Sequence, residues 1–171
     1  ERFLGNMSFR CQNGFPSFRG ENGIIYVSRR NVDKSDINAS SFVPTYLDED
    51  LNTKYFGDFK PSVDTPVQLR LYKLFPWANY MIHAHCYVDT AGVPHSELFQ
   101  TNTPVPCGAL EEVTEIYHII PRTINDMPGT VQLFNKNAPR LLAINLRGHG
   151  CILVAKDVEI FKELQKHRDN C

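Results

Sequence analysis

The sequence predicts a layered α/β domain. Short apolar runs rich in β-forming residues alternate along the chain with stretches whose apolar residues recur at helical spacing. The predicted strands cover residues 23–27, 80–85, 141–146 and 151–155, and the predicted helices cover residues 65–75, 108–120 and 158–165. Because strands and helices alternate, we expect the helices to pack on a sheet.

The first helix has a clear start and one apolar face. Asp64 or Thr65 can cap its N-terminus, and Pro66 is tolerated in the first turn because its missing N–H group has no helical partner there. Gln68 is expected to point away from the apolar face, and Pro76 ends the helix. That face is formed by Val67, Leu71 and Leu74.

The remaining segments are assigned in the same way. Residues 10–22 suggest a loop or hairpin, and residues 28–62 are polar and irregular. In the second helix, Leu110, Val113 and Tyr117 are expected to share one side. The last two strands are joined by a tight turn at residues 147–150, in which glycine permits a positive φ.

Length and composition indicate one globular domain over residues 1–171. The abrupt opening, and the stop at Cys171 soon after His149, raise the expectation of a domain truncated at both ends. Net charge is −1 and no Lys/Arg stripe stands out, so a nucleic-acid partner is not expected. No apolar run approaches the roughly 20 residues of a membrane span, so a membrane partner is not expected either. The five cysteines are irregularly spaced, which favours reduced thiols in a cytoplasmic protein.

Three histidines are candidates for metal binding. His83 and His85 are two residues apart in a predicted strand, so both side chains point to the same side and can reach one ion. His149 lies in a Gly-His-Gly turn between two apolar strands. Three protein ligands with one position left open are typical of a catalytic zinc site. The alternatives are a surface or core His-x-His pair and an ordinary turn histidine.

Several short segments occur in an order that resembles one protein family. The segments are Gly5-Asn6-Met7-Ser8-Phe9-Arg10, Lys60-Pro61-Ser62-Val63-Asp64-Thr65-Pro66, Leu71-Tyr72, Phe75-Pro76, Met81-Ile82-His83-Ala84-His85 and Leu146-Arg147-Gly148-His149-Gly150. Together they resemble the class II aldolase/adducin family over nearly the whole chain. Each segment is weakly specific alone, whereas the ordered set is strongly specific.

The resemblance implies a fold and an activity. The fold would be a three-layer α/β/α sandwich with a central mixed or antiparallel sheet. His83, His85 and His149 would hold Zn²⁺, or another divalent ion such as Mn²⁺ or Co²⁺. The enzyme would cleave or epimerise a sugar phosphate through a metal-stabilised enediolate, as a homotetramer with active sites at subunit interfaces. The sequence does not separate the aldolase from the epimerase.

Two carboxylates acquire roles from the resemblance. Asp64 stands where the aldolases have a glutamate, and the epimerase branch has an aspartate followed by Thr-Pro, as here. Asp64 is therefore a candidate acid/base and fourth metal ligand, with a plain helix N-cap as the alternative. Glu97 lies in a segment that resembles an epimerase acid/base region, with an exposed loop glutamate as the alternative.

The resemblance also implies a phosphate site formed by Gly5, Asn6, Ser28 and Ser62. The chain departs from the family pattern here, because Ser28-Arg29-Arg30-Asn31 replaces Thr-Pro-Ser-Gly and Val63 replaces a second serine. Arg29 or Arg30 could supply charge instead, or both could be solvated. The tyrosine that follows Pro-Cys in the aldolases has no counterpart after Cys107.

Two other protein classes are alternatives. A non-catalytic adducin-like assembly module would share the fold, but the adducin head lacks the metal histidines that this chain has. A cupin-type metal protein would use His83, His85 and Asp89 as its first motif. A β-barrel core without long helices would identify the cupin.

Overall fold

The computed structural model describes residues 4–11, 23–89, 96–120, 122–123, 132–133 and 139–169. The large sheet contains eight strands, and β7 pairs with β8 separately. The elements are β1 (Asn6–Arg10), β2 (Ile25–Ser28), the 3₁₀ turns η1 (Lys34–Asp36) and η2 (Ala39–Ser41), β3 (Phe42–Leu47), β4 (Thr53–Tyr55), α1 (Thr65–Leu74), β5 (Tyr80–Ala84), β6 (Ser96–Gln100), α2 (Glu111–Ile119), β7 (Arg122–Thr123), β8 (Gln132–Leu133), β9 (Leu141–Leu146), β10 (Gly150–Ala155) and α3 (Glu159–Asp169).

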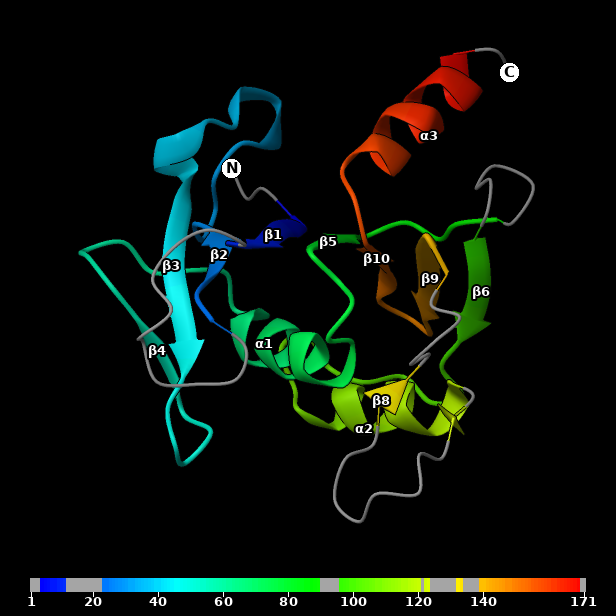
Figure 1. Cartoon of the computed structure of the whole chain (residues 1–171), viewed down its shortest axis with the longest axis horizontal. Helices are drawn as coiled ribbons and strands as arrows, with labels where there is room; N and C mark the ends of the chain where they lie inside the picture. The colour runs from blue at the N-terminus through cyan, green and yellow to red at the C-terminus, as the bar shows by residue number, and fades with distance from the viewer. Residues whose placement is uncertain are drawn as a thin grey trace.

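The sheet is mixed and carries helices on both faces. Its strand order is β4-β3-β2-β1-β5-β10-β9-β6. Adjacent strands are antiparallel, except for β6 and β9, which are parallel. Helices α1 and α2 lie side by side beneath the sheet, and α3 lies on its opposite side (Figure 1). This arrangement confirms the predicted three-layer α/β/α sandwich. It excludes the cupin alternative, which required a barrel without long helices.

The central strands are buried on both faces because each face packs against helices. Along β10, Ile152 and Val154 join the core beneath α1 and α2. Leu153, between them, packs with the cluster that contains Ile160 of α3. Burying each such aliphatic side chain stabilises the fold by roughly 1.5–3 kcal/mol. The helices among the described residues are too short or too polar to cross a membrane.

The structure differs from the sequence predictions in two regions. Residues 28–62, expected to be irregular, contain the long strand β3 and the short strand β4. Residues 6–10 and 96–100 form β1 and β6, which the apolar pattern did not reveal because polar residues interrupt both. The expected loop or hairpin at residues 10–22 falls largely outside the described residues.

The second helix is rotated relative to the prediction. It begins at Glu111 because Gly108 adopts a positive φ of 74°, which delays the helical conformation. Ile116 is fully buried against α1 and the sheet, whereas Leu110 is 42% exposed. The expectation that Leu110 contributes to the buried side is therefore wrong. The same rotation turns Glu112 inward.

The observed register of α2 predicts that substitutions at Ile116 and Leu110 affect the free energy of unfolding differently. Ile116→Ala should lower the free energy of unfolding by about 2–5 kcal/mol, because it removes buried methyl groups and leaves a cavity. Leu110→Ala should change it by less than about 0.5 kcal/mol. Thermal unfolding followed by circular dichroism measures both variants. Equal losses in the two variants would contradict the observed register.

Candidate metal centre

Strand β5 delivers two of the three histidines. His83 lies on β5, and His85 follows the strand by one residue, so the alternation of a strand points both rings to the same side. His83 is 3% exposed, whereas His85 is exposed. The backbone of Gly5 packs on this strand with a positive φ of 78°, and a side-chain carbon there would lie 2.6 Å from the His83 carbonyl oxygen. Glycine therefore permits the N-terminal segment to cover His83.

The turn between β9 and β10 delivers the third histidine. Cys151 pairs with Ala84, so the start of β10 lies beside the end of β5. Gly150 has a φ of 136°, and a side-chain carbon there would overlap the Ala84 carbonyl oxygen. His149 precedes this glycine, and its backbone N–H donates to the Leu146 carbonyl at 2.9 Å, which closes the turn.

The three rings converge on one point. Ring centroids are 4.9 Å apart for His83 and His85, 4.6 Å for His83 and His149, and 5.1 Å for His85 and His149. One nitrogen from each ring lies within 4.8 Å of the others. The Nε2 atoms of His83 and His149 are buried and have no hydrogen-bond partner among the described residues. A divalent ion would satisfy both, so the residues present fit a metal ion.

Local contacts keep the His83 ring in the form that binds metals. The Nδ1–H of His83 donates to the Cys151 carbonyl at 3.0 Å, which leaves the lone pair of Nε2 directed at the centre. Burial lowers the pKa of His83 to about 4, although the nearby Asp64 opposes this shift. Burial also lowers the pKa of His149. At neutral pH both rings are therefore uncharged and available as ligands.

Glu112 orients His149 from helix α2. Its Oε2 atom lies 3.2 Å from Nδ1 of His149, and the residue is 3% exposed. When Nδ1–H donates to this carboxylate, Nε2 of His149 keeps its lone pair toward the centre. Burial raises the pKa of Glu112 to about 8, and the negative charge of Asp64 adds to this shift. The sequence prediction missed Glu112, since only the helix register turns it inward.

Asp64 faces the histidines and does not cap helix α1 with its side chain. Its Oδ2 atom lies 4.0 Å from Nε2 of His83 and accepts a hydrogen bond from the Asn6 amide at 2.6 Å. Its Oδ1 atom accepts a hydrogen bond from the Cys107 thiol at 3.0 Å. The carboxylate is 7% exposed. The N-cap alternative is therefore wrong for the side chain, and Asp64 borders the metal centre.

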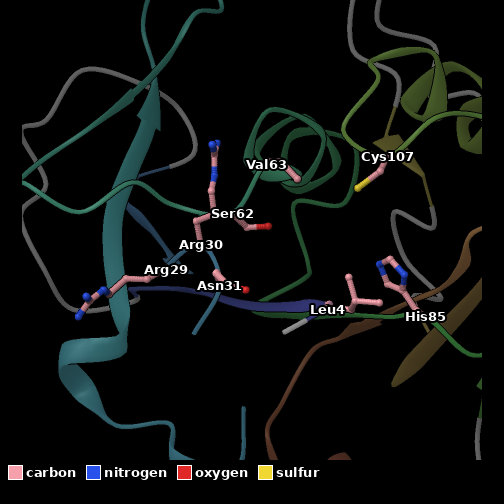
Figure 2. A pocket seen from close by; sticks show the side chains of 9 residues that line it. Leu4, Arg29, Arg30, Asn31, Ser62, Val63, His85 and Cys107 are labelled. Carbon is pink, nitrogen blue, oxygen red and sulfur yellow. The ribbon is translucent and has the colours of Figure 1, made fainter. Parts of the chain in front are cut away.

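A pocket of about 390 Å³ opens beside the histidines. Gly5 and Ser62, two of the expected phosphate contacts, line it together with His85 and Cys107. Figure 2 shows the Ser62 hydroxyl pointing into this space, with His85 and Cys107 on the far side. Polar groups thus lie along the pocket on both sides.

The other two expected phosphate contacts point elsewhere. The side-chain amide of Asn6 bonds to Asp64 and also accepts from Gln68, which is buried despite the expectation that it would face away. Ser28 is fully buried, and its hydroxyl accepts from the Met7 N–H at 3.1 Å. These two side chains make internal contacts and do not line the pocket, so the structure gives no support to a side-chain contact of either residue with phosphate.

Glu97 lies away from the histidines. It is exposed on the edge strand β6 opposite Leu142, four residues along β9 from the Leu146 position that pairs with Gly150. Four residues correspond to about 13 Å. The expected acid/base role of Glu97 therefore finds no geometric support within one chain, and Glu112 is the glutamate beside the histidines. Cys86, which follows His85, is exposed.

Comparisons with known proteins agree with this architecture. The family model described as the class II aldolase and adducin N-terminal domain matches residues 1–164. The comparison with curated proteins found no match.

Solved structures share the fold at low sequence identity. L-fuculose 1-phosphate aldolase superimposes with a TM-score of 0.56 at 15% identity, covering 98% of this chain and 72% of that one. YgbL from Escherichia coli, a proposed aldolase, epimerase or decarboxylase, has a TM-score of 0.57 at 11% identity, with coverages of 97% and 74%. Its counterpart from Klebsiella pneumoniae has a TM-score of 0.55 at 10% identity, with the same coverages. The chain belongs to the class II aldolase and adducin N-terminal domain family.

Proposed function

We propose that this chain is a metal-dependent enzyme of the class II aldolase type, which cleaves or epimerises a sugar phosphate. The observation that carries the proposal is the convergence of three histidines whose two buried Nε2 atoms lack partners among the described residues. A carboxylate and a pocket adjoin them. Zn²⁺ is the proposed ion because three imidazoles and an open position suit it, with Mn²⁺ or Co²⁺ as alternatives.

His83, His85 and His149 would hold the ion. When bound, it would act as a Lewis acid that polarises a substrate carbonyl and stabilises the charge left by carbon–carbon cleavage. The protein contributes the fixed orientation of the rings, through the Cys151 carbonyl for His83 and through Glu112 for His149.

Asp64 is the proposed acid/base. Donors from Asn6 and Cys107 hold its two oxygens, so the carboxylate has a fixed position beside His83. It would accept a proton from a substrate hydroxyl at one oxygen and return it after cleavage. An epimerase would use the same groups and re-form the bond after the aldehyde has turned. A role as fourth metal ligand is the alternative for this side chain.

Assembly into a homotetramer is part of the proposal. Tyr55 ends β4, Phe56 and Phe59 follow it before α1, and all three are at least 40% exposed. Neighbouring aromatic side chains in one exposed segment are suited to burial at a subunit contact. A non-catalytic, adducin-like assembly role is the alternative function, and it would not require the three histidines.

The contact between Glu112 and His149 predicts that replacing Glu112 weakens metal binding. Glu112→Gln should weaken Zn²⁺ binding about 10- to 100-fold, because a bound cation favours the ionised carboxylate, and the amide cannot supply that charge to the His149 ring. Glu111→Gln changes the adjacent, exposed glutamate and should leave the affinity unchanged. Competition with a chromogenic zinc chelator measures both variants. Equal affinities in the two variants would contradict the assigned role of Glu112.

Activity is tested on the metal-loaded protein with pentulose and deoxyhexulose phosphates. Wild type should cleave or epimerise at least one of them, and Asp64→Asn should lower kcat about 10²- to 10⁴-fold. Asp58→Asn, at an exposed position, serves as the control. Metal content measured on each variant separates the roles, because an acid/base variant keeps its ion and a ligand variant binds it more weakly. An inactive, fully loaded wild type would favour the assembly module.

A further inference from the structure

Arg30 and Lys60 form a pair of cations that the backbone holds side by side. The Arg30 N–H donates to the Lys60 carbonyl at 2.9 Å, and the adjacent residues Arg29 and Pro61 form a β-bridge. Both cationic side chains are exposed. Neither forms an ion pair with a carboxylate in the described part of the chain. Like charges held together without a counter-ion are unfavourable, so an anionic ligand would relieve their repulsion.

The pair borders a second hollow of about 170 Å³ that adjoins the larger pocket. Arg30, Ser62 and Val63 line both, so the two spaces lie next to each other at these residues. No aspartate or glutamate lines either space, although the chain as a whole has a net charge of −1. Since a water molecule occupies about 30 Å³, the smaller hollow has room for a phosphate group with a few waters.

The two neighbouring arginines differ in what they contact. The guanidinium of Arg29 lies 3.4 Å from the centre of the Phe59 ring and donates to the Ser40 carbonyl. Arg29 also lines the larger pocket, but in Figure 2 its side chain extends away from Ser62 and His85, whereas the Arg30 side chain runs beside Ser62 on the side opposite His85. Arg30 is therefore the arginine available to an anion, and it lines the smaller hollow together with Lys60.

We propose that a phosphate monoester binds with its phosphate between Arg30 and Lys60. The substrate would then reach from the three histidines across Ser62 and Val63 to this pair. The inference rests on the proposed function for the identity of the ligand. The position of the phosphate is inferred from the internal contacts of Asn6 and Ser28, because these contacts direct both side chains away from the pocket. Arg30, Lys60 and the Ser62 hydroxyl would take the place of these two side chains and donate hydrogen bonds to the charged phosphate.

Binding of inorganic phosphate to metal-free protein tests the proposal by isothermal titration calorimetry at low ionic strength. Lys60→Ala and Arg30→Ala should each weaken binding about tenfold, because each removes a charge-assisted contact. Lys54→Ala is the matched control. Lys54 is an exposed β4 residue that pairs with Asp48 at 3.4 Å and does not line the hollow, so its removal should leave binding unchanged. Circular dichroism establishes that each variant is folded.

Arg29→Ala and Val63→Ser distinguish this site from the phosphate position implied by the family pattern. Both should leave phosphate affinity within about twofold of wild type, because the site does not use the Arg29 guanidinium or a hydroxyl at position 63. The proposal is overturned if wild type does not bind phosphate. It is equally overturned if Lys60→Ala binds normally, or if Val63→Ser strengthens binding severalfold. Because the assay contains no metal, a failure of the proposed enzyme activity would leave this result unaffected.

Discussion

The antiparallel pairing of β5 with β10 is the constraint on which the metal centre depends. It places Cys151 opposite Ala84, so the turn that carries His149 meets the end of the strand that carries His83 and His85. Gly150 makes this approach possible, because a side-chain carbon would overlap the Ala84 carbonyl and lie 2.8 Å from the His85 Cα. The core beneath α1 and α2 fixes both strands. The three rings therefore converge as a consequence of packing in the centre of the sheet.

The centre combines uncharged nitrogen ligands with two carboxylates in different surroundings. Asp64 accepts hydrogen bonds from Asn6 and Cys107, whereas Glu112 is buried beside His149 and its pKa is raised to about 8. In the absence of an ion, the buried Nε2 atoms of His83 and His149 lose the hydrogen bonds that water would give them. A cation would remove this cost and would favour the ionised form of Glu112. Metal binding and the charge of Glu112 are thus coupled at one site.

Local sequence pattern was sufficient to predict the elements with strong periodicity and the three histidines. Spacing places His83 and His85 on one side of a strand, and α1 begins and ends where Pro66 and Pro76 predict. Features that depend on distant contacts were missed. Glu112 contacts a histidine 37 residues away, and Gln68 is buried where its side-chain amide donates to Asn6. A polar residue gives no local signal of such a contact, so the internal hydrogen bonds of the Asn6 and Ser28 side chains were not foreseen either.

The most direct test of the account is the metal content of the purified protein, measured by mass spectrometry for wild type and His149→Ala. His118→Ala, which changes an exposed histidine on α2, is the matched control. About one divalent ion per chain is expected in wild type and in the control, and none in His149→Ala, because two imidazoles hold zinc far more weakly than three. A wild-type protein that contains no ion and takes up none from added zinc would contradict the three-histidine centre.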